Sequence, residues 1–195
     1  MSDFSGFVLA GGRSSRMGTD KAFLELEGRT LLARALDLLH GLTPEVRIVG
    51  PAARFAAYAP VVEDVYAGRG PLAGIHAALS TSTTELNLIL AVDLPFVTDS
   101  LLRFVVEQAR ACQAVVTVPR IAGGYQPLCA VYHRAFVTPA QAALESGRNK
   151  IDALFASTTT RILEESELSR VAFNAAMFEN LNTPEDLRRA MPEKP

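Results

Sequence analysis

The 195-residue chain has no tryptophan, only two cysteines and no long hydrophobic run. Cys112 and Cys129 are far from a C-x-x-C spacing and the three histidines are scattered, so we expect free thiols in a reducing compartment and no zinc site. No stretch approaches the roughly 18 to 20 apolar residues that span a bilayer. The acidic Asp3 stands where a signal peptide needs positive charge. These absences predict a soluble, cytoplasmic protein that is not associated with a membrane.

A large excess of charge of one sign is also absent. The chain has 19 basic and 21 acidic side chains, which gives a formal net charge of −2 at pH 7. Proteins that coat nucleic acid rely on an excess of positive charge, so this balance argues against nucleic acid as a partner. Any local cluster of basic residues in such a chain needs an explanation.

Short apolar runs alternate with segments of helical periodicity, which is the pattern of stacked βαβ units. We therefore predict a single α/β domain over residues 1–195, with three α/β/α layers and a Rossmann-like, mainly parallel sheet. The run 86–92 is apolar on both faces and suits the centre of a parallel sheet. The expected strands are 7–10, 46–49, 60–63, 86–92, 114–118 and 128–132, and the expected helices lie near 30–41, 72–79, 98–109, 134–146, 150–157 and after 183, with Thr98 as a cap.

A glycine-rich segment, Leu9–Lys21, follows the first expected strand. It holds three glycines and gathers Arg13, Arg16 and Lys21 within nine residues. Glycines let backbone N–H groups point at an anion, and basic side chains add charge-assisted hydrogen bonds. The segment is neither a Walker A loop nor G-x-G-x-x-G. A phosphate-binding loop and a solvated turn with surface arginines are both open from the residues alone.

Polar side chains follow other expected strands, where ligands bind to open parallel sheets. Asp93 comes directly after 86–92 and is either a turn former or a ligand of Mg²⁺, which favours one or two carboxylates completed by phosphate oxygens. Glu63 and Asp64 lie at the end of 60–63 and are either solvated or able to accept hydrogen bonds from a base or ribose. Asn180 and Asn182 precede the last helix, where two amides on one side can bind a polar ligand.

The segment from Leu9 to Ala22 reads L-A-G-G-x-S-x-R-M-G-x-D-K-A. It resembles the signature of nucleotidyltransferases that activate small phosphorylated molecules. Its D-K-A ending is most similar to that of the molybdenum cofactor guanylyltransferases. Further matches extend this resemblance over most of the chain, at residues 70–74, 92–96, 126–132 and 180–187.

The resemblance implies that GMP is transferred from GTP to the terminal phosphate of molybdopterin, with release of pyrophosphate. It implies a sheet of the nucleotide-diphospho-sugar transferase type, with a nucleotide-binding part up to about residue 110 and a molybdopterin-binding C-terminal part. Proteins that supply or insert the cofactor, and acceptor molybdoenzymes, are then expected partners. The implied residues are Leu9, Ala10, Gly11 and Gly12 around GTP, Arg16 and Lys21 on its phosphates, Asp64 in the nucleotide site, Asp93 on Mg²⁺, and Asn180 and Asn182 on molybdopterin. Arg16, Lys21 and Asp93 would be the catalytic residues.

Alternatives remain open at this point. A cytidylyltransferase or a sugar-phosphate nucleotidyltransferase would have the same fold, and a carrier of molybdopterin would need no catalysis. After strand 46–49 an asparagine would be a natural contact for a purine, but Gly50 and Pro51 stand there. Base recognition at this position would therefore fall to backbone groups.

Overall fold

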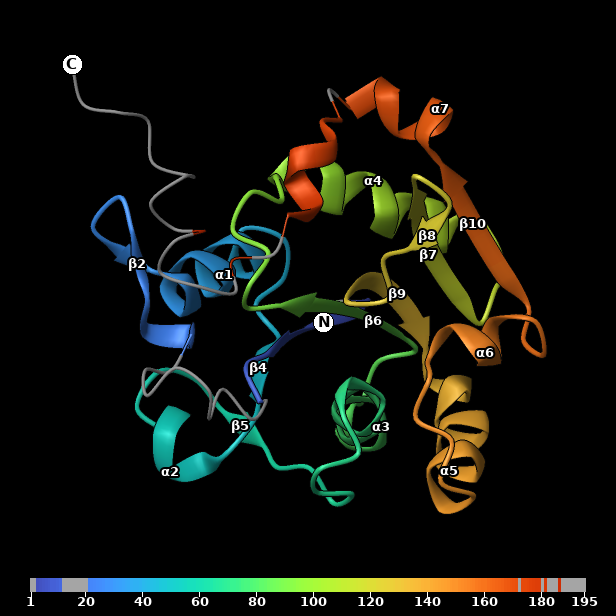
Figure 1. Cartoon of the computed structure of the whole chain (residues 1–195), viewed down its shortest axis with the longest axis horizontal. Coiled ribbons are helices and arrows are strands. Elements are labelled where there is room, and N and C mark those ends of the chain that lie inside the picture. Colours follow the sequence, from blue (N-terminus) through green and yellow to red (C-terminus); the bar gives the residue numbers. More distant parts are fainter. Residues whose placement is uncertain (1–2, 12–20, 172, 180, 182–185, 187–195) are drawn as a thin grey trace.

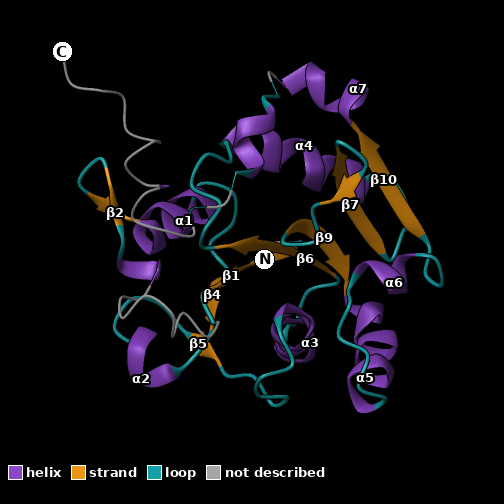
Figure 2. Ribbon diagram, in the orientation of Figure 1, coloured by secondary structure: helices purple, strands orange, loops and turns teal. Residues whose placement is uncertain are grey.

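An eight-stranded sheet runs through the middle of the computed structural model, which describes residues 3–11, 21–171, 173–179, 181 and 186 (Figures 1 and 2). The strand order is β10-β7-β9-β6-β1-β4-β5, and β8 pairs with β7. The strands are β1 (Phe4–Leu9), β4 (Val46–Val49), β5 (Val61–Val62), β6 (Leu86–Ala91), β7 (Val116–Ile121), β8 (Gly124–Tyr125), β9 (Cys129–His133) and β10 (Thr160–Glu164). A separate hairpin joins β2 (Glu25–Leu26) to β3 (Arg29–Thr30).

The strand directions confirm a mainly parallel sheet, with one correction. β1 is parallel to β4 and β6, β4 to β5, and β7 to β10. β9 is antiparallel to both β6 and β7, because the chain returns from β7 through the tight turn at Ala122 and Gly123, where φ is positive. The centre of the sheet is therefore mixed rather than wholly parallel. The carboxyl ends of β1, β4, β5, β6 and β7 meet at one edge.

Helices cover both faces of the sheet, as the three-layer prediction requires. In Figure 1, α1 and α4 lie above the sheet and α3 and α5 below it. Successive residues of a strand point to opposite faces, so Val8 packs with α1 and α4 while Phe7 packs with α3 and α5. The helices are α1 (Leu31–His40), α2 (Ala52–Phe55), α3 (Pro71–Thr81), α4 (Asp99–Arg110), α5 (Val137–Glu145), α6 (Asp152–Phe155) and α7 (Glu165–Leu168).

Several local predictions are confirmed and others differ. Thr98 caps α4 by accepting a hydrogen bond from the Leu101 N–H at 3.3 Å, and β4 has the expected bounds. The strand expected at 114–118 begins at Val116 and continues to Ile121. The helix expected at 134–146 begins as a separate 3-10 turn, Arg134–Phe136. The hairpin β2–β3, strands β8 and β10 and helices α2 and α7 were not predicted. Of the helix expected after 183, only residue 186 is described, and it is helical.

Both cysteines are free, as expected. Cys129 is fully buried in β9, and this burial raises the pKa of its thiol to about 12. Over the part of the chain that the structure describes, no helix is long and apolar enough to cross a bilayer.

Candidate nucleotide site

The first residues of the glycine-rich segment are clamped between two neighbouring strands. The N–H groups of Ala10 and Gly11 both donate to the carbonyl oxygen of Val49 at 3.0 Å. On the other side, the carbonyl oxygen of Leu9 accepts a hydrogen bond from the Val92 N–H at 3.1 Å. Leu9 and Ala10 are buried, whereas Gly11 is exposed. The segment therefore leaves the sheet at its carboxyl edge from a fixed starting point.

The rest of the segment, residues 12–20, lies outside the described residues. Two of the predicted site residues, Gly12 and Arg16, fall in that stretch. The chain is described again from Lys21, which begins a 3-10 helix, Lys21–Phe23.

Gly50 follows β4 and lies close to the residues that hold the start of the glycine-rich segment. A Cβ atom on Gly50 would lie 2.9 Å from Cε2 of Phe55 and 3.3 Å from the Gly11 nitrogen. The Phe55 ring cannot easily move, since it is fully buried and stacks on Phe23 with 5.9 Å between ring centroids. Position 50 therefore has no room for a side chain such as asparagine, and its glycine is a requirement of packing.

Replacing Gly50 by alanine is expected to lower the free energy of unfolding by about 1–3 kcal/mol, the usual cost of overpacking a core. Urea unfolding measures the change. Gly41→Ala is the matched control, because a Cβ there meets only ordinary contacts, the nearest at 3.5 Å. Equal stability of the two variants would show that the Phe55 ring yields without cost.

Lys21 and Asp93 form an ion pair beside the clamp. The distance from Lys21 Nζ to Asp93 Oδ2 is 3.7 Å, and the two side chains are 26% and 22% exposed. Burial raises the pKa of Asp93, and the Lys21 ammonium partly offsets that rise. Two residues that are far apart in the sequence are thus brought together at the ends of β1 and β6. One is a cation suited to phosphate and the other a carboxylate suited to a metal ion.

The donor set around Asp93 fits Mg²⁺. Among the described residues there is no group of three or more His, Cys, Asp or Glu side chains that could enclose a metal ion. Mg²⁺ does not need such a cage, because it is commonly held by one or two carboxylates with substrate phosphates and waters completing its octahedron. A single, largely buried carboxylate at the edge of the sheet where the glycine-rich segment begins could serve as such a ligand.

The C-terminal segment reaches the same place. The N–H of Leu181 donates to the carbonyl oxygen of Asp93 at 3.1 Å, and the Leu181 side chain is buried. Leu181 stands between Asn180 and Asn182 in the sequence. Both asparagines lie outside the described residues, so the structure brings their neighbour to Asp93 without describing the amides themselves.

Glu63 and Asp64, the two acidic residues after β5, accept hydrogen bonds from different parts of the chain. Asp64 Oδ1 accepts a hydrogen bond from the Tyr66 N–H at 2.7 Å, which closes a tight turn. The Tyr66 ring meets His76 of α3 edge to face, with 5.2 Å between centroids. Glu63 Oε1 instead accepts from the Ala52 N–H at 2.9 Å, at the start of α2. Both carboxylates stand at the same edge of the sheet as Gly11 and Asp93.

The chain that forms this site matches a known family. Residues 6–162 match the family model described as the MobA-like NTP transferase domain. The chain belongs to that family. It is 35% identical over 188 residues to a probable molybdenum cofactor guanylyltransferase from Pelotomaculum thermopropionicum, and the match covers 95% of this chain and 91% of the relative.

Other comparisons agree with membership of the MobA-like NTP transferase family. A molybdenum cofactor guanylyltransferase from Desulfosudis oleivorans is 34% identical, with 97% of this chain and 95% of the relative covered. The crystal structure of molybdopterin-guanine dinucleotide biosynthesis protein A from Archaeoglobus fulgidus superposes with a TM-score of 0.84 at 25% identity, covering 95% of each chain. The resemblance noted in Leu9–Ala22 and the predicted fold type are thereby confirmed, and the chain is a nucleotidyltransferase.

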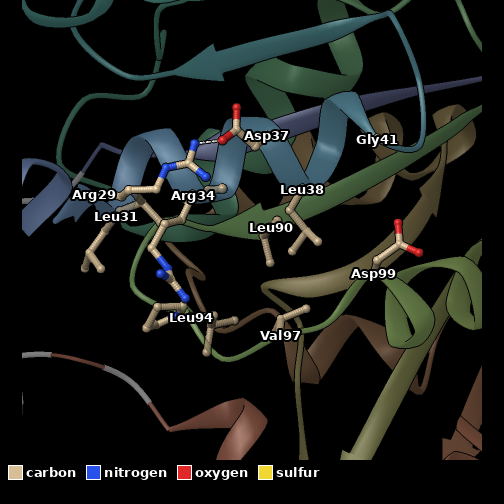
Figure 3. Close-up of a pocket in the computed structure, with 13 residues that line it drawn as sticks. Arg29, Leu31, Arg34, Asp37, Leu38, Gly41, Leu90, Leu94, Val97 and Asp99 are labelled. Carbon is tan, nitrogen blue, oxygen red and sulfur yellow. Dashed lines mark ion pairs between the residues drawn. The ribbon is translucent and has the colours of Figure 1, made fainter. Parts of the chain in front are cut away.

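A pocket of about 400 Å³ lies beside the site of this MobA-like domain and was not predicted (Figure 3). It is bounded by α1 and by the segment between β6 and α4, including Leu94 and Pro95, whereas Lys21 and Asp93 do not line it. Arg34 extends into it from α1, and Arg29 pairs with Asp37 at its rim (Figure 3). Helical periodicity identified the buried face of α1 but gave no sign that its flank borders a pocket.

Proposed function

We propose that this nucleotidyltransferase transfers GMP from GTP to the terminal phosphate of molybdopterin, forming molybdopterin guanine dinucleotide and pyrophosphate. The observation that carries the proposal is the ion pair between Lys21 and Asp93 beside the clamped start of the glycine-rich segment. The names of the relatives supply the identity of the two substrates.

The reaction requires charge stabilisation rather than a covalent enzyme intermediate. A phosphate oxygen of molybdopterin attacks the α-phosphorus of GTP and forms a new P–O bond, while the bond to the β-phosphate breaks and its electron pair leaves with pyrophosphate. The attacking phosphate is already an anion, so no general base is needed. The barrier comes from bringing anions together and from charge that develops on the leaving group, which fixed cations and N–H groups offset.

The proposed nucleotide residues follow from this requirement. The backbone from Leu9 to Gly12 would hold GTP, Arg16 and Lys21 would neutralise its phosphates, and Asp64 would lie in the nucleotide site. Asp93 would hold a divalent cation, proposed as Mg²⁺, which supplies Lewis-acid stabilisation of phosphate charge when bound. Positioning of the two substrates for in-line attack contributes the remainder.

The second substrate is assigned to the C-terminal part. Asn180 and Asn182 would contact molybdopterin, and the hydrogen bond from Leu181 to Asp93 supports this placement because it ties their segment to the proposed metal ligand. The part up to about residue 110, which contains Asp93, would bind the nucleotide. Cofactor-supplying and cofactor-inserting proteins and acceptor molybdoenzymes would be the partners in such a pathway.

One experiment separates this function from its alternatives. The protein is incubated with Mg²⁺, molybdopterin and each of the four ribonucleoside triphosphates, and pyrophosphate is measured. We expect pyrophosphate to be released when the triphosphate is GTP and not when it is one of the other three. Release with CTP would indicate a cytidylyltransferase, and binding of molybdopterin without any pyrophosphate would indicate a carrier.

A further inference from the structure

We infer that Glu63 recognises the guanine base and is the residue that selects GTP over other nucleotides. The inference deepens the proposed guanylyl transfer and rests on it. It starts from the order in which candidate groups occur along the carboxyl edge of the sheet.

The nucleotide has a direction along this edge. The neighbouring strands β6, β1, β4 and β5 are followed at this edge by Asp93, Gly11, Gly50 and Glu63 respectively. Adjacent strands lie about 4.8 Å apart, so β6 and β5 are separated by about 14 Å. An extended nucleotide spans a comparable length. With its phosphates between Lys21 and the glycine-rich segment, its base lies towards β4 and β5.

The end of β4 offers no hydrogen-bond donor or side chain to a base. The Gly50 N–H already donates to the carbonyl oxygen of Val62 at 3.0 Å, and Pro51 has no N–H group. Gly50 also has no space for a side chain, because the Phe55 ring occupies it. The sequence predicts that backbone groups at this position contact the base. Of those groups, only carbonyl oxygens remain available. The next strand, β5, is followed at the same edge by the acidic side chain of Glu63.

Glu63 is placed to supply that side chain. Its Oε1 accepts the Ala52 N–H at 2.9 Å, which holds the carboxylate against the turn that follows Gly50. The residue is exposed, and it has no other partner among the residues that the structure describes. Each carboxylate oxygen carries two acceptor positions, so Oε2 and one position on Oε1 remain available to a ligand.

A carboxylate at this position favours guanine by simple complementarity. Guanine presents N1–H and N2–H donors side by side, and a carboxylate accepts both in charge-assisted hydrogen bonds. Adenine and cytosine present an acceptor nitrogen, N1 or N3, at the corresponding place, which a carboxylate repels. Inosine keeps N1–H but lacks the amino group, so it would lose one of the two bonds.

The Asp64 carboxylate lies on the α3 side of this edge, away from the contact that Glu63 makes with α2. Its Oδ1 is engaged by the Tyr66 N–H within its own turn. The ring of the same Tyr66 contacts His76 on α3, which places this turn on the α3 side. Glu63 contacts α2 instead. Of the two acids, Glu63 is therefore the one beside the turn after β4.

The test is Glu63→Gln, with GTP, ITP and CTP titrated calorimetrically in the presence of Mg²⁺. Glutamine keeps a carbonyl oxygen for the Ala52 N–H but places an amino group where guanine needs an acceptor. A hydrogen bond to a charged group contributes enough for the wild type to prefer GTP over ITP by about tenfold or more. Glu63→Gln is expected to weaken GTP binding by a similar factor, to bring the GTP and ITP affinities together, and to leave thermal unfolding unchanged.

Glu85→Gln is the matched control. Glu85 precedes β6 at the opposite edge of the sheet and pairs with His133, so the same loss of charge there should leave the ratio of GTP to ITP affinity intact. A ratio that Glu63→Gln does not change overturns the inference, and so does a wild type that binds GTP, ITP and CTP equally. A wild type that binds none of the three overturns guanylyl transfer as well, which distinguishes the two failures.

Discussion

Asp93→Asn is expected to lower the rate of pyrophosphate release by at least about 100-fold, which corresponds to about 2.7 kcal/mol of lost transition-state stabilisation. The amide keeps the size of the side chain but not the charge that would hold a divalent cation. Steady-state pyrophosphate release at saturating GTP and Mg²⁺ measures the loss. Asp37→Asn serves as control, because it removes a carboxylate that pairs with Arg29 on the surface of α1. Turnover near that of the wild type would remove Asp93 from the catalytic machinery.

The Asp93→Asn variant is also expected to have a free energy of unfolding at least as large as that of the wild type at neutral pH. Burial raises the pKa of Asp93 in the folded protein above that of the unfolded chain. An acid whose pKa is raised on folding stabilises the folded state only while it is protonated. This stabilisation is lost as the pH rises through the folded pKa. At neutral pH the ionised carboxylate therefore lowers stability, and asparagine relieves that cost. Urea unfolding of the metal-free proteins over a pH series from acid to neutral checks the sign, since the advantage of the variant should grow as the pH rises from the ordinary carboxyl pKa through the folded pKa of Asp93.

Lys21→Ala is expected to reduce turnover by a comparable factor, about 100-fold or more, which is typical when a fixed charge-stabilising group is removed. The ammonium lies 3.7 Å from Asp93 and beside the start of the glycine-rich segment. In the proposed function it neutralises phosphate charge, and its charge also favours the ionised form of Asp93. Without Lys21 the pKa of Asp93 rises further, and the acid limb of the residual activity should move to higher pH. Pyrophosphate release across a pH series measures both effects.

Lys150→Ala is the control for this variant, because Lys150 is an exposed lysine between α5 and α6. Retention of most of the activity by Lys21→Ala, or an acid limb that does not move, would contradict the role given to the ion pair.

The parts of the fold that the sequence predicts are those with local causes. β4 and the Thr98 cap of α4 follow from a short apolar run and a capping side chain. β10 has no such signal, because most of its residues are only half-buried. Arg161 and Glu164 are instead held by ion pairs with Glu167 and Arg120, and the strand exists through its pairing with β7.

In the site, too, the sequence identifies what has a local cause and misses what depends on tertiary packing. The glycine-rich segment and Asp93 could be identified because each follows an apolar strand directly. The approach of Lys21 to Asp93 and the burial of that pair depend on tertiary packing, and no pattern in the sequence carries them. Gly50 is explained only by the Phe55 ring, and the contact of Glu63 with Ala52 only by the pairing of β4 with β5.

The reversed strand β9 acts as a spacer within the sheet. Because it runs between β6 and β7, the carboxyl ends of those two strands stand two strand spacings apart, about 10 Å, on a rim that they nevertheless share. Because β9 pairs with β6 on one side and β7 on the other, the sheet is continuous between those two strands. The register of β6, β1, β4 and β5 is therefore set by pairings among these four strands, without a contribution from β7 or β10.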